Sequence, residues 1–88
     1  MQVEFTNQFQ KDFAKRIAGT ALDAEFEALL AHLMAGGALP VKYRDHPLKG
    51  DRLGRRDCHL RPDMVVLYAR GSTVLKLYRI GSHSELFG

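Results

Sequence analysis

The sequence lacks the features that mark secreted, disulfide-bonded and membrane-spanning proteins. It contains one cysteine, Cys58, which excludes an internal disulfide and suits a reducing compartment. The residues after Met1 contain neither the basic segment nor the apolar stretch of a signal peptide. No apolar run approaches the roughly 20 residues that a membrane-spanning helix needs. We therefore expect a cytoplasmic protein with no membrane partner.

Internal repeats and low-complexity segments are also absent, and the length favours a single domain over residues 1–88. Proteins of this size bury roughly 60% of their unfolded surface, so we expect a modest core. Hydrophobic residues make up 45% of the chain and charged residues 26%, which is typical of an ordinary globular protein.

Acidic residues are scarce relative to basic ones in the second part of the chain. Residues 1–38 carry three Lys or Arg against five Asp or Glu, a net charge of −2. Residues 39–88 carry ten against five, a net charge of +5, and the two parts sum to the overall +3. This asymmetry indicates a surface that faces a polyanion, built from the C-terminal half.

Hydrophobic periodicity predicts the elements of the N-terminal part. Residues 1–6 alternate between apolar and polar side chains, which indicates a half-buried strand. Apolar residues then recur at helical spacing in two segments, 9–17 and 22–33, and two glycines end the second. The short connection between the segments predicts a helical hairpin with one apolar face.

The C-terminal part reads as three further strands. Residues 38–54 are punctuated by proline and glycine and resist assignment, whereas residues 56–61 alternate and residues 64–69 form a continuous apolar run. Gly71-Ser72 is a two-residue hairpin signal before a last strand over 73–80. The predicted fold is α+β with the order β-α-α-β-β-β, in which the hairpin packs on one face of a small antiparallel sheet.

The predicted turns imply a register for the last three strands. A Gly71-Ser72 loop pairs Met64 with Arg79, and an Arg61-Pro62 loop pairs His59 with Met64. The resulting row of His59, Met64 and Arg79 would place the outer two backbones about 10 Å apart on one face. Long side chains at that spacing could hold one phosphate from both sides.

Proton carriers and phosphate binders gather in residues 45–63 and 79–88. Ser82-His83-Ser84-Glu85 fits a capping box, so we expect a helical turn to begin there and to hold His83 close to the edge of the sheet that carries Arg79. Histidine suits both proton transfers of RNA cleavage by a 2′-OH, and arginine suits the developing phosphoryl charge.

The segments that carry these groups resemble a known family. The matching residues are Asp45-His46-Pro47-Leu48, Gly50, Gly54, Arg56-Asp57, His59, Pro62-Asp63, Arg79, Gly81, His83 and Leu86-Phe87-Gly88. Their pattern resembles that of YafQ-like toxins in the RelE/ParE superfamily of toxin–antitoxin modules. The resemblance extends over the whole chain in length and element order and implies a RelE-like fold.

The resemblance implies a ribosome-dependent mRNA endonuclease that works without metal or other cofactor. It assigns acid–base roles to His46, His59, Asp63 and His83, phosphate support to Arg79, and substrate contact to Phe87. Met64 stands where the family has Trp, which leaves out a base-stacking surface worth about 1–3 kcal/mol per base and bears on codon preference. The implied partners are the 70S ribosome, mRNA and a cognate antitoxin, usually a ribbon-helix-helix dimer. Operator DNA would be bound only through the antitoxin complex.

Within this set we expect His83 to be the general acid and Arg79 to hold the phosphate. His46, His59 and Asp63 would share the base and orienting roles, and the sequence leaves open which histidine is the base. The residues expected to contact RNA backbone are basic and lie in the same segments: Lys49, Arg52, Arg55, Arg56 and Arg61.

Three other interpretations remain. A zinc site could form from His46, His59, Asp63 and His83, although no short paired-ligand spacing favours it. The same fold could serve as a ParE-like inhibitor of a protein target such as gyrase, which would not need the histidines. A degenerate toxin could act only as a co-repressor with its antitoxin.

Overall fold

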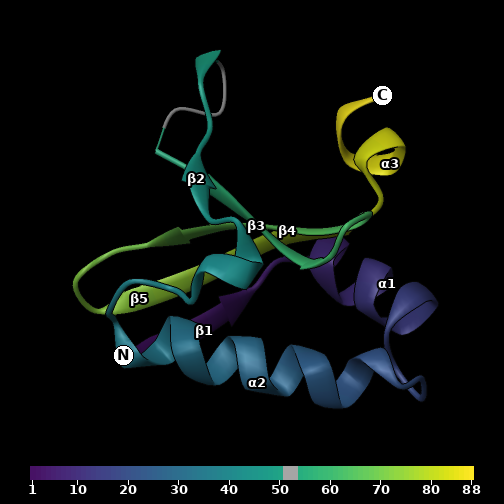
Figure 1. Cartoon of the computed structure of the whole chain (residues 1–88), viewed down its shortest axis with the longest axis horizontal. Helices are drawn as coiled ribbons and strands as arrows, with labels where there is room; N and C mark the ends of the chain where they lie inside the picture. The colour runs from purple at the N-terminus through teal and green to yellow at the C-terminus, as the bar shows by residue number, and fades with distance from the viewer. Residues whose placement is uncertain (51–53) are drawn as a thin grey trace.

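The structure, a computed structural model, describes residues 1–50 and 54–88 (Figure 1). Arg52, one of the expected RNA contacts, lies outside the described residues. The elements in chain order are β1 (Gln2–Phe5), α1 (Asn7–Arg16), α2 (Leu22–Ala35), the 3₁₀ helix η1 (Val41–Tyr43), β2 (His46–Pro47), β3 (Arg56–Arg61), β4 (Met64–Arg70), β5 (Val74–Gly81) and α3 (His83–Phe87). No described helix is both long and apolar enough to cross a membrane.

The strands form one sheet in the order β1-β5-β4-β3-β2. The α+β class and the helices packed on the sheet are confirmed, but the sheet is not wholly antiparallel, because β1 runs parallel to β5. The physical reason is the connection: α1 and α2 follow β1, and a long helical crossover allows a parallel partner where a tight turn does not. The edge strand β1 thus pairs with the last strand of the chain.

Helices α1 and α2 lie on one side of the sheet and α3 lies on the other (Figure 1), while β2 is the edge strand beside β3. Thr6 caps α1, since its side chain accepts a bond from Phe9 N at 3.0 Å. The main core fills the space between the helices and the sheet, where the Phe9 and Phe26 rings lie tilted to each other at a centroid distance of 5.8 Å. Cys58 is fully buried in the same core.

The opposite face of the sheet carries a second, smaller core. Val65 and Leu67 of β4 are buried against Leu86 of α3, with Leu48 and Tyr78 packed beside them. This cluster anchors α3 over the end of the sheet. We call this side of the sheet, away from α1 and α2, the outer face.

The predicted register of the β4–β5 hairpin is wrong by two residues. Arg70 pairs with Leu75 instead of Thr73, because Gly71 N bonds to Val74 O and the loop is formed by residues 72–73. A shift of two keeps each side chain on its predicted face, because the side-chain period of a strand is two.

A β-bulge then changes the register again. Tyr68 pairs with Leu77, whereas Leu67 pairs with Arg79, so Tyr78 is the extra residue. The bulge allows Leu77 and Ile80, three residues apart, both to reach the main core. The predicted pairing of Met64 with Arg79 is therefore wrong.

The turn between β3 and β4 also differs from the prediction. Arg61 pairs with Met64, so residues 62–63 form the loop, and an irregularity between His59 and Arg61 makes Val65 the partner of His59. The predicted row of His59, Met64 and Arg79 does not exist. The observed rows are His59 with Val65 and Gly81, and Asp57 with Leu67 and Arg79.

Residues 38–54 were left unassigned from the sequence, and their described part contains two short elements. Val41–Tyr43 forms η1, with Tyr43 buried in the main core. His46–Pro47 forms β2, which pairs with Asp57 and Arg56 of β3. Scattered apolar residues gave too little periodicity to predict elements of two and three residues.

Candidate active site

Three histidines lie side by side on the outer face, although they come from three different elements. His46 is on β2, His59 on β3 and His83 begins α3. The ring centroids of His46 and His59 are 6.4 Å apart, and those of His59 and His83 are 5.2 Å apart. Phe87 continues the row, 6.0 Å from His83. The fold thus brings together the predicted histidines and the predicted aromatic substrate contact.

The middle histidine of this row is the most enclosed. The side chain of His59 is only 10% exposed, whereas those of His46 and His83 are 53% and 50% exposed. The row therefore has a sheltered centre between two imidazoles that solvent or a ligand can reach.

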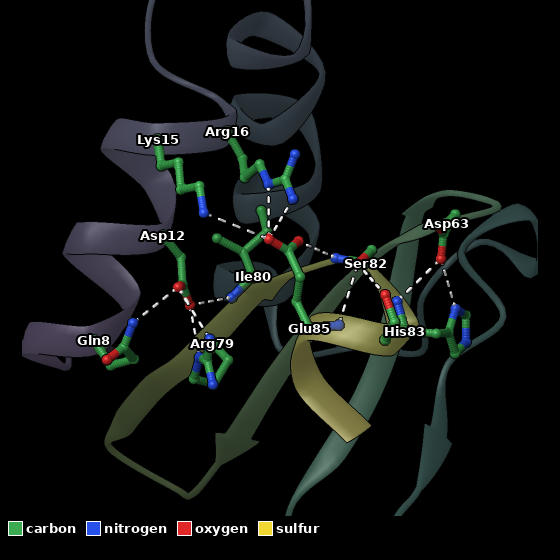
Figure 2. A network of polar contacts seen from close by, with 11 residues as sticks. Gln8, Asp12, Lys15, Arg16, Asp63, Arg79, Ile80, Ser82, His83 and Glu85 are labelled. Atoms are coloured by element: carbon green, nitrogen blue, oxygen red, sulfur yellow. Dashed lines mark hydrogen bonds and ion pairs between the residues drawn. The ribbon is translucent and has the colours of Figure 1, made fainter. Parts of the chain in front are cut away.

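Asp63 fixes the orientation of His83, as Figure 2 shows. Its Oδ1 accepts bonds from the His83 backbone N at 3.0 Å and from His83 Nδ1 at 3.1 Å. The backbone bond first, and then the imidazole, lower the pKa of Asp63, so it stays a carboxylate. Because the carboxylate is an acceptor, His83 Nδ1 carries the proton and Nε2 is the nitrogen open for proton transfer.

His46 is oriented through the same ring nitrogen. His46 Nδ1 lies 3.0 Å from the carbonyl oxygen of Arg44 and 3.1 Å from Asp57 Oδ1. Both neighbours are acceptors, so Nδ1 carries the proton, and its hydrogen bond goes to Arg44. His46 Nε2 is thereby left as the lone-pair nitrogen of the neutral ring.

Asp57 is a site residue that the sequence reasoning did not select. Its side chain is 5% exposed, and its Oδ1 accepts no hydrogen bond from the described residues despite lying near two imidazoles. Burial raises the pKa of Asp57. The available signal was strand alternation, since Asp57 and His59 are two residues apart and share a face.

His59 lies between two acceptors. Its Nδ1 is 3.3 Å from the carbonyl oxygen of Pro62, which assigns the proton to that nitrogen, and its Nε2 is 3.7 Å from Asp57 Oδ1. The second distance is too long for a hydrogen bond. A lone pair of His59 therefore faces the buried carboxyl group of Asp57, whose pKa is raised by burial.

Arg79 is on β5, and its guanidinium is held by a residue of α1. Asp12 accepts bonds from Arg79 Nε at 2.8 Å and Nη2 at 3.2 Å, and from Ile80 N at 3.2 Å (Figure 2). Burial acts to raise the pKa of Asp12, but the bonds from Arg79, Gln8 and Ile80 outweigh it and lower that pKa. Arg79 does not face His59 across the sheet as predicted, because the bulge at Tyr78 moves it into the row of Asp57.

The expected RNA contacts fall into different surroundings. The guanidinium of Arg55 stacks 3.8 Å from the centroid of the Tyr78 ring. The other two arginines are tied to acidic side chains: Arg56 bonds to Asp45 and Arg61 to Glu25.

Two expected substrate contacts differ in exposure. Lys49 is exposed, whereas Met64 is half-buried against the main core.

Among residues 1–50 and 54–88, no group of three His, Cys, Asp or Glu side chains is arranged to hold a metal ion.

Comparison with known proteins agrees with this fold. Residues 1–88 match the family model described as the bacterial toxin of type II toxin–antitoxin system, YafQ. The chain is 34% identical over 88 residues to the mRNA interferase toxin YafQ of Escherichia coli strain K12, which covers 98% of this chain and 95% of that protein.

Two solved structures extend the comparison. A copper-bound mutant toxin from Helicobacter pylori is 34% identical and has a TM-score of 0.91, with 99% of each chain covered. The Escherichia coli DinJ–YafQ complex gives 33% identity and a TM-score of 0.84, over 99% of this chain and 98% of that one. The chain therefore belongs to the YafQ family of bacterial type II toxins, and the predicted resemblance is confirmed.

Proposed function

We propose that this protein is an mRNA interferase that cuts translated mRNA on the ribosome, without metal, by attack of the RNA 2′-OH on the adjacent phosphate. The observation that carries the proposal is the row of three imidazoles in which each Nδ1 faces a protein acceptor. The similar Escherichia coli protein is named an mRNA interferase toxin. A pure binding surface has no need for three histidines with their proton positions fixed in this way.

The reaction requires two proton transfers. A base removes the 2′ proton as the 2′-oxygen bonds to phosphorus, and an acid protonates the 5′-oxygen as its bond to phosphorus breaks. The products are a 2′,3′-cyclic phosphate and a 5′-hydroxyl. In this proposal His83 is the acid, because Asp63 holds its Nδ1 and leaves Nε2 as the nitrogen that hands the proton to the 5′-oxygen.

The base is His46 or His59, each with Nε2 unprotonated in the neutral ring. Asp57 is a positioning residue in this scheme, because it lies within 3.1 Å of His46 and 3.7 Å of His59.

Charge that develops on the phosphoryl oxygens needs a cation. Arg79 supplies it in this proposal: Asp12 occupies Nε and Nη2, and Nη1 has no bond to another described residue. An arginine has five N–H donors, so a held guanidinium can still bind phosphate. Arg55, stacked on Tyr78, is the second candidate, and Phe87 would hold a base beside His83.

The proposed partners are the ribosome with its mRNA, and a cognate antitoxin of the ribbon-helix-helix kind that keeps the toxin inactive. The similar Escherichia coli toxin has been solved in complex with DinJ. Contact with operator DNA would take place only through the antitoxin complex.

Cell-free translation with mapping of mRNA 5′ ends tests the proposal. The wild type should produce cuts inside translated codons that disappear without ribosomes, and His83→Ala should reduce them at least 100-fold, the usual minimum for a general acid. His32→Ala, an exposed histidine on α2 outside the row, is the matched control and should cut normally. Translation arrest without cuts would refute the nuclease and favour a ParE-like inhibitor; no effect would favour a co-repressor.

A further inference from the structure

A cavity of about 330 Å³ lies beside His59, outside the row of histidines. Its walls come from α2, from η1 with the residue after it, and from the end of β3 with the following turn. The lining residues are Glu25, Ala28, Lys42, Tyr43, Arg44, His59, Leu60, Arg61 and Pro62. The volume is at the lower end of the range for small-ligand sites, large enough for one small planar group with its attachments.

The rim of this cavity is basic, and its three cationic side chains differ in the contacts that they make with other residues. Arg61 is bonded to Glu25, and Lys42 lies 5.1 Å from the centroid of the Tyr43 ring. Arg44 is exposed and makes no ion pair with any other described residue. Three cations against one carboxylate give the lining a charge of +2, with the Arg44 guanidinium free to bind an anion.

The backbone of Arg44 is strained. It has φ 49° and ψ 45°, and it is the only residue other than glycine with positive φ in the described part of the chain. The left-handed conformation is unfavourable for a residue with a side chain, whereas glycine adopts it freely. Its place at the end of η1 calls for a glycine, so ending the helix does not explain an arginine there.

The same residue touches the histidine row. Its carbonyl oxygen accepts the bond from His46 Nδ1 at 3.0 Å, and its own N bonds to Val41 O at 3.0 Å. The left-handed turn therefore directs the carbonyl to His46 while the side chain lines the cavity. The cavity and the histidine row therefore share two residues, Arg44 and His59.

We propose that the cavity binds the mRNA nucleotide next to the cleaved phosphate, with Arg44 contacting that nucleotide's own phosphate. The apolar walls of Ala28, Leu60 and Pro62 accept the face of a base, and the cationic rim accepts the anion. This inference rests on the proposed nuclease function and adds a substrate subsite to it.

The strained backbone supplies an informative variant. Arg44→Gly removes the guanidinium and relieves the strain, while the carbonyl that orients His46 is retained. The Tm should therefore stay at or above that of the wild type, because the strain is relieved and no side-chain bond to another described residue is lost. Arg44→Lys keeps the charge, and Lys11→Ala removes one exposed charge from α1 as a control for net charge.

Binding is measured by NMR titration of the whole protein with a 2′-O-methyl hexaribonucleotide of mixed sequence, which cannot be cleaved through a 2′-OH. The backbone amides of Tyr43, Arg44 and Leu60 should shift. Arg44→Gly should weaken the apparent affinity about tenfold, the loss of one charge-assisted contact worth about 1.4 kcal/mol. Arg44→Lys and Lys11→Ala should stay within threefold. Shifts confined to the histidine row, or unchanged affinity in Arg44→Gly, would overturn the proposal.

Cleavage mapping separates the two possible sources of the phosphate. If the cavity holds the mRNA, Arg44→Gly should lower cutting by a similar factor at all codons while ribosome binding stays unchanged, because a phosphate contact carries no base information. Cutting that falls together with ribosome binding would assign the contact to ribosomal RNA and refute a substrate subsite. If the hexaribonucleotide shifts the amide signals of the cavity residues in the wild type but the wild type cuts no mRNA, the nuclease proposal fails. The cavity would then still be a nucleotide-binding site.

Discussion

The bonds that Asp12 accepts make it the polar residue whose loss should cost the most stability. Asp12→Ala removes the acceptor for Ile80 N and the partner of Arg79 at once. An unsatisfied buried N–H costs about 1–3 kcal/mol. The ion pair adds about 1 kcal/mol, discounted because the Arg79 side chain is one-third exposed. We expect the free energy of unfolding to fall by about 3 kcal/mol.

Asp12→Asn separates the two contributions, since its amide oxygen can still accept from Ile80 N while the charge is lost. It should cost about 1 kcal/mol. For a domain of this size, each 1 kcal/mol lowers Tm by about 4–8 °C, so Asn should lower it by about 6 °C and Ala by about 18 °C. Glu4→Gln, an exposed acid on β1, should have no measurable effect.

The effect of Asp12 on stability should also depend on pH. Its folded-state pKa is lowered from 3.8, so its contribution is fully present above the unfolded-state pKa and is lost as pH falls through the folded-state pKa. The difference between the wild type and Asp12→Asn should therefore shrink below about pH 4. Urea unfolding of the three proteins between pH 3 and pH 7 measures both effects. Equal costs for Asn and Ala, or a difference that does not vary with pH, would refute this assignment of the bonds.

Three further predictions concern other polar bonds. Ser82→Ala removes the capping box of α3 and should lower the free energy of unfolding, measured in urea, by about 1 kcal/mol. It should also lower mRNA cleavage, because His83 begins that helix, and an unchanged stability would contradict the cap. Tyr68→Phe removes a buried donor to Asp45 and should cost about 2 kcal/mol by the same measurement, and a change below 0.5 kcal/mol would show that this bond contributes little. Arg16→Ala should raise the pKa of Glu85 from about 2 toward its ordinary value, because the Arg16 hydrogen bond is the main cause of the lowering. An NMR titration of the carboxyl group measures this, and an unchanged pKa would refute that cause.

Local chemistry allowed part of the site to be predicted. A capping box needs only a serine and a glutamate three residues apart, so the start of α3 could be read from the chain, and with it the place of His83. Strand alternation put His59 on the face opposite Cys58. These signals act within a few residues and do not depend on how distant segments meet.

Other parts of the site depend on distant segments. The bulge at Tyr78 arises because Leu77 and Ile80 must both reach a core built with α1 and α2, and it moves Arg79 away from His59. Asp12, 67 residues from Arg79, carried no sequence signal for holding that guanidinium. Asp57 could be placed on the right face, but its surroundings depend on distant segments that bring His46 and His83 near it.

The sequence by itself determined the α+β class, the one-sided helices and the segments that hold the proton carriers, because periodicity and capping are local properties of the chain. Only the tertiary structure decided that β1 runs parallel to β5, that Asp12 holds Arg79, and that Arg44 lines a cavity beside His59. Those features depend on which surfaces bury one another, and burial is a property of the whole fold. The same alternating strand can pair parallel or antiparallel, or shift its register by two residues, while its apolar side chains stay in the core.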